Sequence, residues 1–148
     1  IRSRIGIEHG ALVFAEADDL LEAVREEREK RPVDCVLIDE AQFLSKAQVE
    51  QLTKVVDEEN VPVLTYGIRT DFLGETFEGS EYLMAWADEI KEIKAICHCG
   101  KKATMNARVD PSGRMETEGN QIEIGGNERY VSLYRSCFSK SDTGPGSS

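Results

Sequence analysis

Val36-Leu37-Ile38-Asp39-Glu40-Ala41-Gln42-Phe43 is the stretch that gives the strongest indication of the fold of this chain. Residues 35–38 are apolar without alternation, so we expect a strand buried on both faces, as in a parallel sheet covered by helices. Two carboxylates follow at its C-terminal end. In open α/β sheets, ligands bind outside the carboxyl ends of the strands. Asp39 and Glu40 are therefore either two solvated acids or groups of a nucleotide site, one holding Mg²⁺ and the other acting on the substrate.

Helices and strands alternate on both sides of this stretch. Residues 11–15 suit a buried strand, and a helix is expected from about Asp18 or Asp19 to Lys30. Ser45 and Gln48 form a capping-box pattern that begins a helix reaching about residue 60. Residues 61–66 form the next expected strand, followed by a helix near 80–87 and a strand near 90–96. A strand, a helix and a second strand in this order predict a right-handed crossover unit and α/β architecture.

Length and composition restrict the class of protein. A chain of 148 residues builds one sizeable core with a small appendage. The sequence has neither a long apolar run nor the pattern of a signal peptide, so we expect a soluble cytoplasmic protein whose four cysteines are thiols. The net charge of −10 disfavours a protein that coats nucleic acid, since such proteins need a basic surface.

The C-terminal third has the layout of a zinc ribbon. Cys97 and Cys99 lie in a turn, a β-hairpin is expected from strands near 103–109 and 129–134, and Cys137 follows it. Between the two strands of this hairpin we expect a turn at 110–113, a polar loop and a short strand near 121–124. Paired zinc-binding cysteines usually have two residues between them, whereas here there is one. The fourth ligand stays open among His98, Tyr134, water and a group outside this sequence, and the alternative is a hairpin with unligated thiols. Cys35 is expected to be a small core residue.

Four motifs in this order closely resemble the type II thymidine kinases, especially their enterobacterial-like branch. They are residues 36–43, 66–72, 96–100 and 124–130, and the likeness extends from about residue 3 to 138. The resemblance implies a RecA-like parallel sheet with flanking helices, of the P-loop NTPase type, plus a small zinc-ribbon-like β domain. The corresponding boundaries are 1–95 for the core, 96–138 for the zinc-binding domain and 139–148 for a disordered tail.

The resemblance also implies an activity and partners. The family transfers a phosphoryl group from ATP, with Mg²⁺, to the 5′-hydroxyl of thymidine and gives dTMP. It further implies structural Zn²⁺ held by Cys97, Cys99 and Cys137, a homotetramer, and feedback inhibition by dTTP.

Individual roles follow by position in the family motifs. Glu40 corresponds to the general base, and Asp39 to the acid associated with Mg²⁺. The loop at about 109–130 resembles the family's lasso, which closes over the nucleoside; its two glycines allow close approach of the backbone. The residues implied to surround the nucleoside are Phe43, Ile68, Phe72, Phe77, Asn106, Ile124, Gly125, Gly126 and Tyr130.

Two departures from the family are visible. The family's N-terminal strand and its phosphate loop ending in Gly-Lys-Ser are absent from the printed sequence, so this chain alone is expected to have almost no kinase activity. Tyr134 stands where relatives place a metal-binding cysteine.

Two other functions compete with the kinase. Asp39-Glu40-Ala41-Gln42 also suits the Walker B strand of an ATPase or helicase, but that function needs a second domain and basic contacts. A non-catalytic zinc-ribbon interaction module needs neither Glu40 nor a loop with two glycines.

Overall fold

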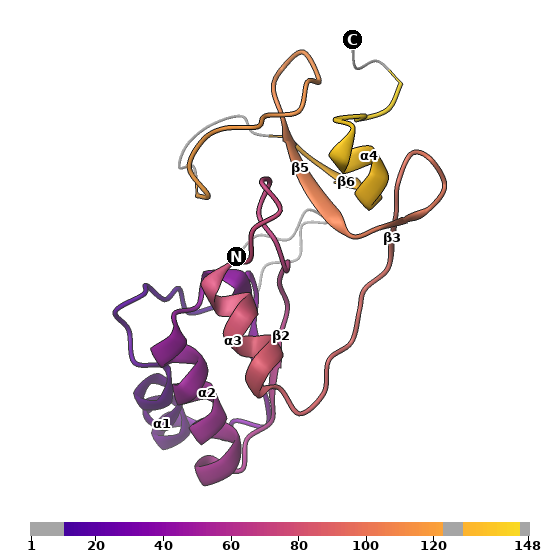
Figure 1. The fold of residues 1–148 in the computed structure, drawn as a ribbon. Helices are drawn as coiled ribbons and strands as arrows, with labels where there is room; N and C mark the ends of the chain where they lie inside the picture. The colour runs from indigo at the N-terminus through magenta and orange to yellow at the C-terminus, as the bar shows by residue number, and fades with distance from the viewer. Residues whose placement is uncertain (1–10, 123–128, 146–148) are drawn as a thin grey trace.

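The computed structural model describes residues 11–122 and 129–145, and these form two parts (Figure 1). The first is an α/β part with helices α1 (Leu20–Lys30), α2 (Lys46–Glu59) and α3 (Glu78–Trp86). The second is a β-rich part that ends in the short helix α4 (Arg135–Ser139). An extended connection, residues 87–94, links them.

The α/β part is built on two parallel strands joined by a helix, as predicted. Strand β1 (Val36–Ile38) pairs with β2 (Val63–Thr65), with Leu37 opposite Leu64, and α2 connects them. Both long helices begin where the sequence indicates. Asp19 accepts a hydrogen bond from the Glu22 amide at the start of α1, and Ser45 forms a complete capping box with Gln48 at the start of α2.

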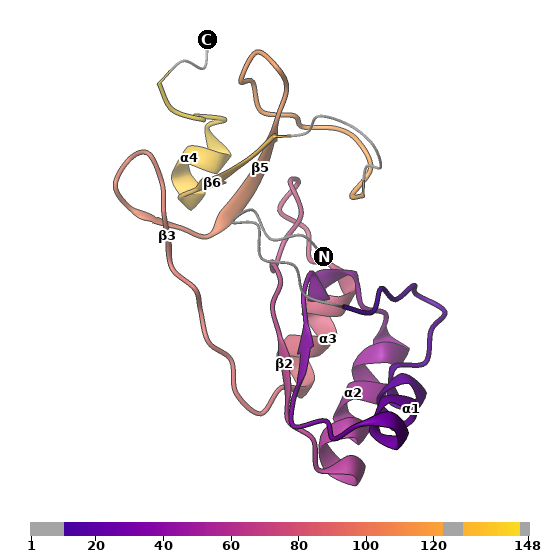
Figure 2. The ribbon, with the colours of Figure 1, turned by 180° about the vertical axis from the view of Figure 1, so that it is seen from behind.

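All three helices pack on one face of the two strands. The views in Figures 1 and 2 place α1 and α2 to the same side of β2. The main core cluster joins residues of both helices, β1 and the short 3-10 turn η1 (Ala41–Phe43), with Tyr82 and Leu83 of α3 packed against it. Its buried members are Leu20, Ile38, Ala41, Leu44, Val49 and Leu52.

The prediction of a strand buried on both faces is wrong for β1. Leu37 is 66% exposed and Leu64 43% exposed, because the helices cover only the face that carries Val36, Ile38 and Val63. Cys35 is also exposed and is not the core residue that we expected. Residues 11–15 form no strand either, since Leu12 and Val13 point into solvent.

The second part consists of two small antiparallel pairs. Strand β3 (Ala95–Ile96) pairs with β4 (Lys102–Ala103), and β5 (Met105–Val109) pairs with β6 (Arg129–Leu133). A tight turn at 110–113 follows β5, as expected. Strand β3 is much shorter than the predicted 90–96, and residues 121 and 122 are not in a strand. Cys97, Ala107, Leu133 and Cys137 form the buried core of this part.

Residues 139–145 make defined contacts, although the Ser- and Gly-rich composition predicts none. The amide of Asp142 donates to the carbonyl of Cys137 (2.9 Å), and the hydroxyl of Thr143 donates to the carbonyl of Gly113 (2.8 Å). No helix in the described part of the chain is long and apolar enough to cross a membrane.

Candidate functional site

The carboxylates of Asp39 and Glu40 stand at the C-terminal end of β1, as the sequence predicts. Both residues are exposed. The pairing with the segment after β2 continues past the end of β1, because the Ala41 amide donates to the Tyr66 carbonyl (2.8 Å). Glu40 itself has φ 51° and ψ 43°, a left-handed conformation that residues with a Cβ seldom adopt. Its amide donates to the Asp39 carboxylate (2.9 Å), which fixes the two acidic residues relative to each other at this turn.

Gln42 orients Glu40 and was not assigned a role from the sequence. The Gln42 side chain is 4% exposed and donates from Nε2 to Oε2 of Glu40 (2.5 Å). Its Oε1 accepts from the amide of Ile68 (3.4 Å). Gly67 makes room for it, since a Cβ there would lie 2.8 Å from that oxygen. A glutamine between the apolar residues Ala41 and Phe43 was the available sequence signal, because an amide that becomes buried there needs hydrogen-bond partners.

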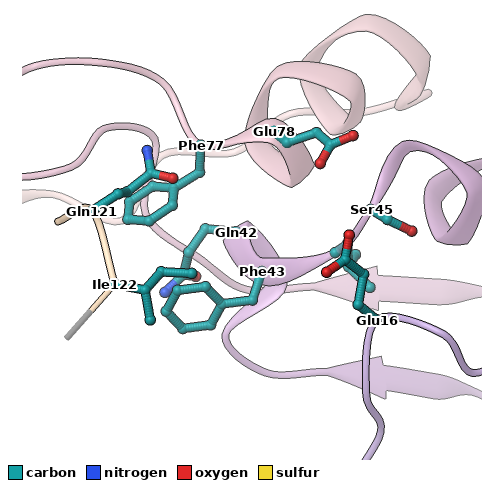
Figure 3. A pocket seen from close by; sticks show the side chains of 9 residues that line it. Glu16, Gln42, Phe43, Ser45, Phe77, Glu78, Gln121 and Ile122 are labelled. Atoms are coloured by element: carbon teal, nitrogen blue, oxygen red, sulfur yellow. The ribbon is translucent and has the colours of Figure 1, made fainter. Parts of the chain in front are cut away.

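A pocket opens beside this turn. Its volume is about 110 Å³, and Gln42 forms part of its wall (Figure 3). The rings of Phe43 and Phe77 meet edge to face, with centroids 5.6 Å apart and planes at 87°. Gln121 and Ile122 close the side next to these rings, as Figure 3 shows. The complete lining is Glu16, Gln42, Phe43, Leu44, Ser45, Phe77, Glu78, Gln121 and Ile122.

The structure brings together only some of the residues expected around a nucleoside. Phe43 and Phe77 line the pocket, and Ile68 contacts Gln42 from the segment after β2. Phe72 is instead 1% exposed and lies beneath the guanidinium of Arg108. Asn106 and Tyr130 lie on β5 and β6, and Tyr130 is 54% exposed. The remaining three candidates, Ile124, Gly125 and Gly126, lie outside the described residues.

Arg108 is a second residue that the sequence did not single out. It is completely buried on β5, and its guanidinium carbon stacks 3.8 Å from the centroid of the Phe72 ring. Its Nε donates to the Tyr130 hydroxyl (3.2 Å), and Nη2 donates to the carbonyls of Asn120 (3.1 Å) and Gln121 (3.3 Å). An arginine among the apolar residues of a strand was the available signal, because a buried charge requires specific partners.

Three cysteines meet in the second part of the molecule, as their spacing predicted. The sulfur atoms of Cys97, Cys99 and Cys137 all lie within 4.8 Å of one another. Burial opposes ionisation of Cys97, but hydrogen bonds from the backbone at Cys99 and Tyr134 outweigh it and lower the pKa of this thiol to about 7. Burial raises the pKa of Cys137 to about 12. Three clustered sulfurs with one thiolate that forms readily suit a Zn²⁺ ion.

Two side chains were candidates for a fourth ligand, and their surroundings differ. His98 lies with Cys137 and Asp142 in a second group whose ligand atoms are within 4.8 Å of one another. Its Nε2 is 3.0 Å from the Asp142 carbonyl and 3.5 Å from the Asp142 carboxylate. The ring of Tyr134 lies under the ammonium of Lys101 at 4.9 Å. His98 is thus the candidate whose ring nitrogens are near a cluster sulfur.

Comparison with known proteins gives one consistent result. The family model for thymidine kinase matches residues 1–138. A thymidine kinase of Shewanella oneidensis is 54% identical over 138 residues, which cover 93% of this chain and 72% of the relative. Thymidine kinases of Rhodopirellula baltica and Xanthomonas campestris pv. campestris are also 54% identical; the matches cover 93% and 99% of this chain, and 65% and 70% of those proteins.

Proposed function

The chain belongs to the thymidine kinase family, and from that premise we propose that it serves the ATP-dependent phosphorylation of the thymidine 5′-hydroxyl. The observation that supports this most directly is that the pocket with Phe43 and Phe77 lies beside the turn that carries Asp39 and Glu40. Phe43 and Phe77 line the pocket, and Gln42 belongs both to its wall and to the hydrogen bond with Glu40. A nucleobase held between the rings of Phe43 and Phe77 would therefore place its sugar near the carboxylate of Glu40.

The size of the pocket indicates which part of the nucleoside it holds. A volume of about 110 Å³ is below the range of about 300–1,000 Å³ that is typical of sites for whole small molecules. We therefore place only the thymine ring between Phe43, Phe77 and Ile122, with the sugar outside. The family resemblance supports Ile68, Asn106 and Tyr130 as further surroundings of the base, whereas Phe72 is buried beneath Arg108 and acts there only through that arginine.

In this proposal, Glu40 is the general base that removes the proton of the 5′-hydroxyl. The hydrogen bond from Gln42 fixes the position of its carboxylate, and such positioning is what proton transfer requires. The exposed carboxylate of Asp39 supplies hard oxygen ligands of the kind that Mg²⁺ prefers. Mg²⁺, when bound with ATP, neutralises charge on the phosphates.

We assign the finer features of fold and assembly on the same basis. The parallel β1–α2–β2 unit is consistent with a RecA-like core up to residue 95, and the cysteine hairpin with a zinc-ribbon-like domain at 96–138. The family resemblance further supports a homotetramer and inhibition by dTTP, which carries the same base as the substrate. For the metal, Cys97, Cys99 and Cys137 are the ligands, and His98 is favoured over Tyr134 as the fourth because it lies near Cys137.

Thermal unfolding in the presence of thymidine tests the proposal. A ligand that binds only the folded state stabilises it by about 2.7 kcal/mol at a concentration of 100 Kd, so Tm should rise with thymidine concentration. Phe43→Ala should abolish the shift, whereas Ile93→Ala, at an exposed position in the connection, should retain it. Formation of dTMP from thymidine and ATP with Mg²⁺ by the full-length protein tests the reaction itself.

The outcomes separate the alternatives. An ATPase or helicase would hydrolyse ATP without a thymidine-dependent shift, and an interaction module would bind zinc but neither nucleoside nor ATP. Neither is favoured, since the matching relatives are thymidine kinases.

A further inference from the structure

Arg108 lies behind the loop that borders the candidate nucleoside pocket and donates to two of its carbonyls. We propose that Arg108 is a positioning residue that holds the loop at residues 110–122 against the 69–77 segment and so sets the affinity for the nucleoside. The inference rests on the proposed function, since it concerns the same pocket. The two parts of the molecule come together here: in Figures 1 and 2 the segment that follows β2 extends toward β5.

The contacts of the guanidinium tie three segments together. Its planar face stacks on Phe72 of the 69–77 segment at 3.8 Å. One nitrogen, Nη2, donates to two successive carbonyls of the loop, those of Asn120 and Gln121. A second nitrogen, Nε, donates to the hydroxyl of Tyr130, which lies directly across from Arg108 on β6. Arg108 is completely buried, and removing the partners of a buried charge strongly destabilises the folded protein. We therefore expect these contacts to be present together.

A second connection fixes the same end of the loop through a side chain. The amide of Gln121 donates to the Asp71 carboxylate (2.9 Å) and to the Thr76 carbonyl (3.3 Å). Asp71 is 4% exposed, and its other oxygen accepts from the amides of Leu73 (2.9 Å) and Glu75 (3.0 Å). Arg108 therefore holds the backbone of Gln121 while Asp71 holds its side chain.

The loop passes over Arg108 at close range. Gly119 has φ 133°, and a Cβ at this position would lie 3.5 Å both from Nη1 of Arg108 and from the Phe72 ring. The backbone conformation disfavours any side chain there. The loop thus depends on glycine at position 119 because of its backbone conformation, next to the residues that Arg108 holds.

These contacts matter for the pocket because of what the loop carries. Gln121 and Ile122 form the wall next to Phe43 and Phe77, as Figure 3 shows. Arg108 acts from behind that wall, through the carbonyl of Gln121 and the hydroxyl of Tyr130. A pre-positioned wall raises affinity because less ordering is needed when the ligand binds. The chemistry at Glu40 lies on another segment, so the rate of phosphoryl transfer should depend little on Arg108.

The test compares Arg108→Lys with Arg129→Lys in the full-length protein. Lysine keeps the charge but has neither the planar face that stacks on Phe72 nor the fork of donors that reaches two carbonyls. For Arg108→Lys we expect the Kd and KM for thymidine to rise at least tenfold, with kcat within about threefold of the original. Amide exchange of residues 112–121 should also become faster without ligand. Arg129 is exposed on β6, and its replacement should change none of these.

Two further variants keep the proposal testable if Arg108→Lys fails to fold. Tyr130→Phe removes the hydroxyl that accepts from Arg108, and Gln121→Ala removes the two hydrogen bonds that its side chain donates to Asp71 and Thr76. Both positions are exposed, and each variant should raise Kd severalfold. Unchanged Kd in folded Arg108→Lys, or in both of these variants, overturns the inference, and so does a loss confined to kcat. If the unaltered protein does not bind thymidine, the proposed function fails. The positioning role can still be tested when thymidine does not bind, by amide exchange of the loop. Unchanged exchange in Arg108→Lys overturns that role, and if Arg108→Lys does not fold, unchanged exchange in both Tyr130→Phe and Gln121→Ala does so.

Discussion

Glu40 combines an uncommon backbone conformation with an exposed carboxylate. A left-handed conformation is less favourable by about 1–2 kcal/mol for a residue with a Cβ. Such residues gather at functional sites, where the surrounding structure holds them in place. Here the Asp39 carboxylate holds the amide of Glu40, and Gln42 holds its side chain.

Replacement of Glu40 by glutamine should therefore separate binding from chemistry. Glu40→Gln keeps the size of the side chain but cannot accept the hydroxyl proton, so we expect kcat of the full-length protein to fall by about 10²–10⁴. The thymidine Kd, measured by calorimetry, should change less than threefold. Glu81→Gln, on the exposed side of α3, is the matched control. Full turnover by Glu40→Gln would remove this residue from the role of base.

Gly79 lets α3 approach the acidic turn closely. A Cβ at this position would lie 2.5 Å from the Ala41 carbonyl oxygen and 2.8 Å from those of Gln42 and Leu44. Gly79→Ala should therefore destabilise the protein by about 1–3 kcal/mol, as overpacking does, and displace the neighbouring Phe77 from the pocket. Chemical denaturation and thymidine affinity measure the two effects. Glu81→Ala on the same helix is the control; a Gly79→Ala protein of unchanged stability would show that the helix can shift freely.

The sequence predicted those site residues whose side-chain type itself indicates a chemical role. The acidic pair, the aromatic residues and the cysteines are recognisable because their chemistry is visible in their residue types. Gln42 and Arg108 were missed, since their roles arise from partners up to 26 and 36 residues away along the chain, Ile68 and Phe72. Phe72 was recognised as an aromatic near the site, but its burial under Arg108 could not be inferred from spacing.

At the scale of elements, Glu59 links the ends of α1 and α2. Its two oxygens each lie 2.6 Å from an arginine of α1, Arg25 and Arg28. The hydrogen bond from Arg25 and the charges of both arginines hold the pKa of Glu59 below its usual value of 4.5, although partial burial opposes this. A lowered folded-state pKa adds stability above the unfolded-state pKa, and this contribution is lost as pH falls through the folded-state value.

We therefore expect Glu59→Gln to lower Tm at pH 7 and to have progressively less effect below pH 4.5. High salt should reduce the difference at pH 7, because it screens exposed ion pairs. Thermal scans from pH 3 to 7 measure this, with Asp57→Asn, at an exposed position of α2, as the control. A Tm difference that stays constant across this range would contradict the electrostatic explanation.

Helices could be predicted more completely than strands. The caps of α1 and α2 are local, since each uses residues within three positions, and both helices begin within one or two residues of the prediction. Strand length and burial depend on what lies beside and above the strand. The apolar pattern at 35–38 predicts burial without identifying a covering element, and Leu37 is exposed where the described helices cover only the other face.

At the scale of the whole molecule, the pocket is shared between the two parts. Phe43 and Phe77 belong to the α/β part, whereas Gln121 and Ile122 come from the loop between β5 and β6. The β-rich part must therefore be folded for the pocket to have the wall that Gln121 and Ile122 form. That part has a small core, in which two of the four buried members are the cysteines Cys97 and Cys137. A core of this size is usually supported by a metal or a disulfide.

Removal of metal should consequently unfold the β-rich part and spare the α/β part. Protein purified without chelator should contain about one zinc per chain, and less than about a third would contradict the proposed site. After chelation, we expect amide exchange to accelerate across β5 and β6 and to stay unchanged in α1 and α2. Thymidine affinity should fall in parallel, because the loop that carries Gln121 and Ile122 loses its support.

Variants at the cysteines and at His98 refine the metal test. Cys137→Ser should reproduce the effect of chelation, whereas Cys35→Ser, at an exposed thiol outside the cluster, should not. His98→Asn should weaken zinc binding more than Tyr134→Phe if His98 is the fourth ligand; the reverse order would assign that position to Tyr134. Exchange that accelerates equally in α1, α2, β5 and β6 would show instead that the two parts unfold as one unit. In that case the loop with Gln121 and Ile122 and the turn with Asp39 and Glu40 would unfold together, and metal removal would not affect the loop alone.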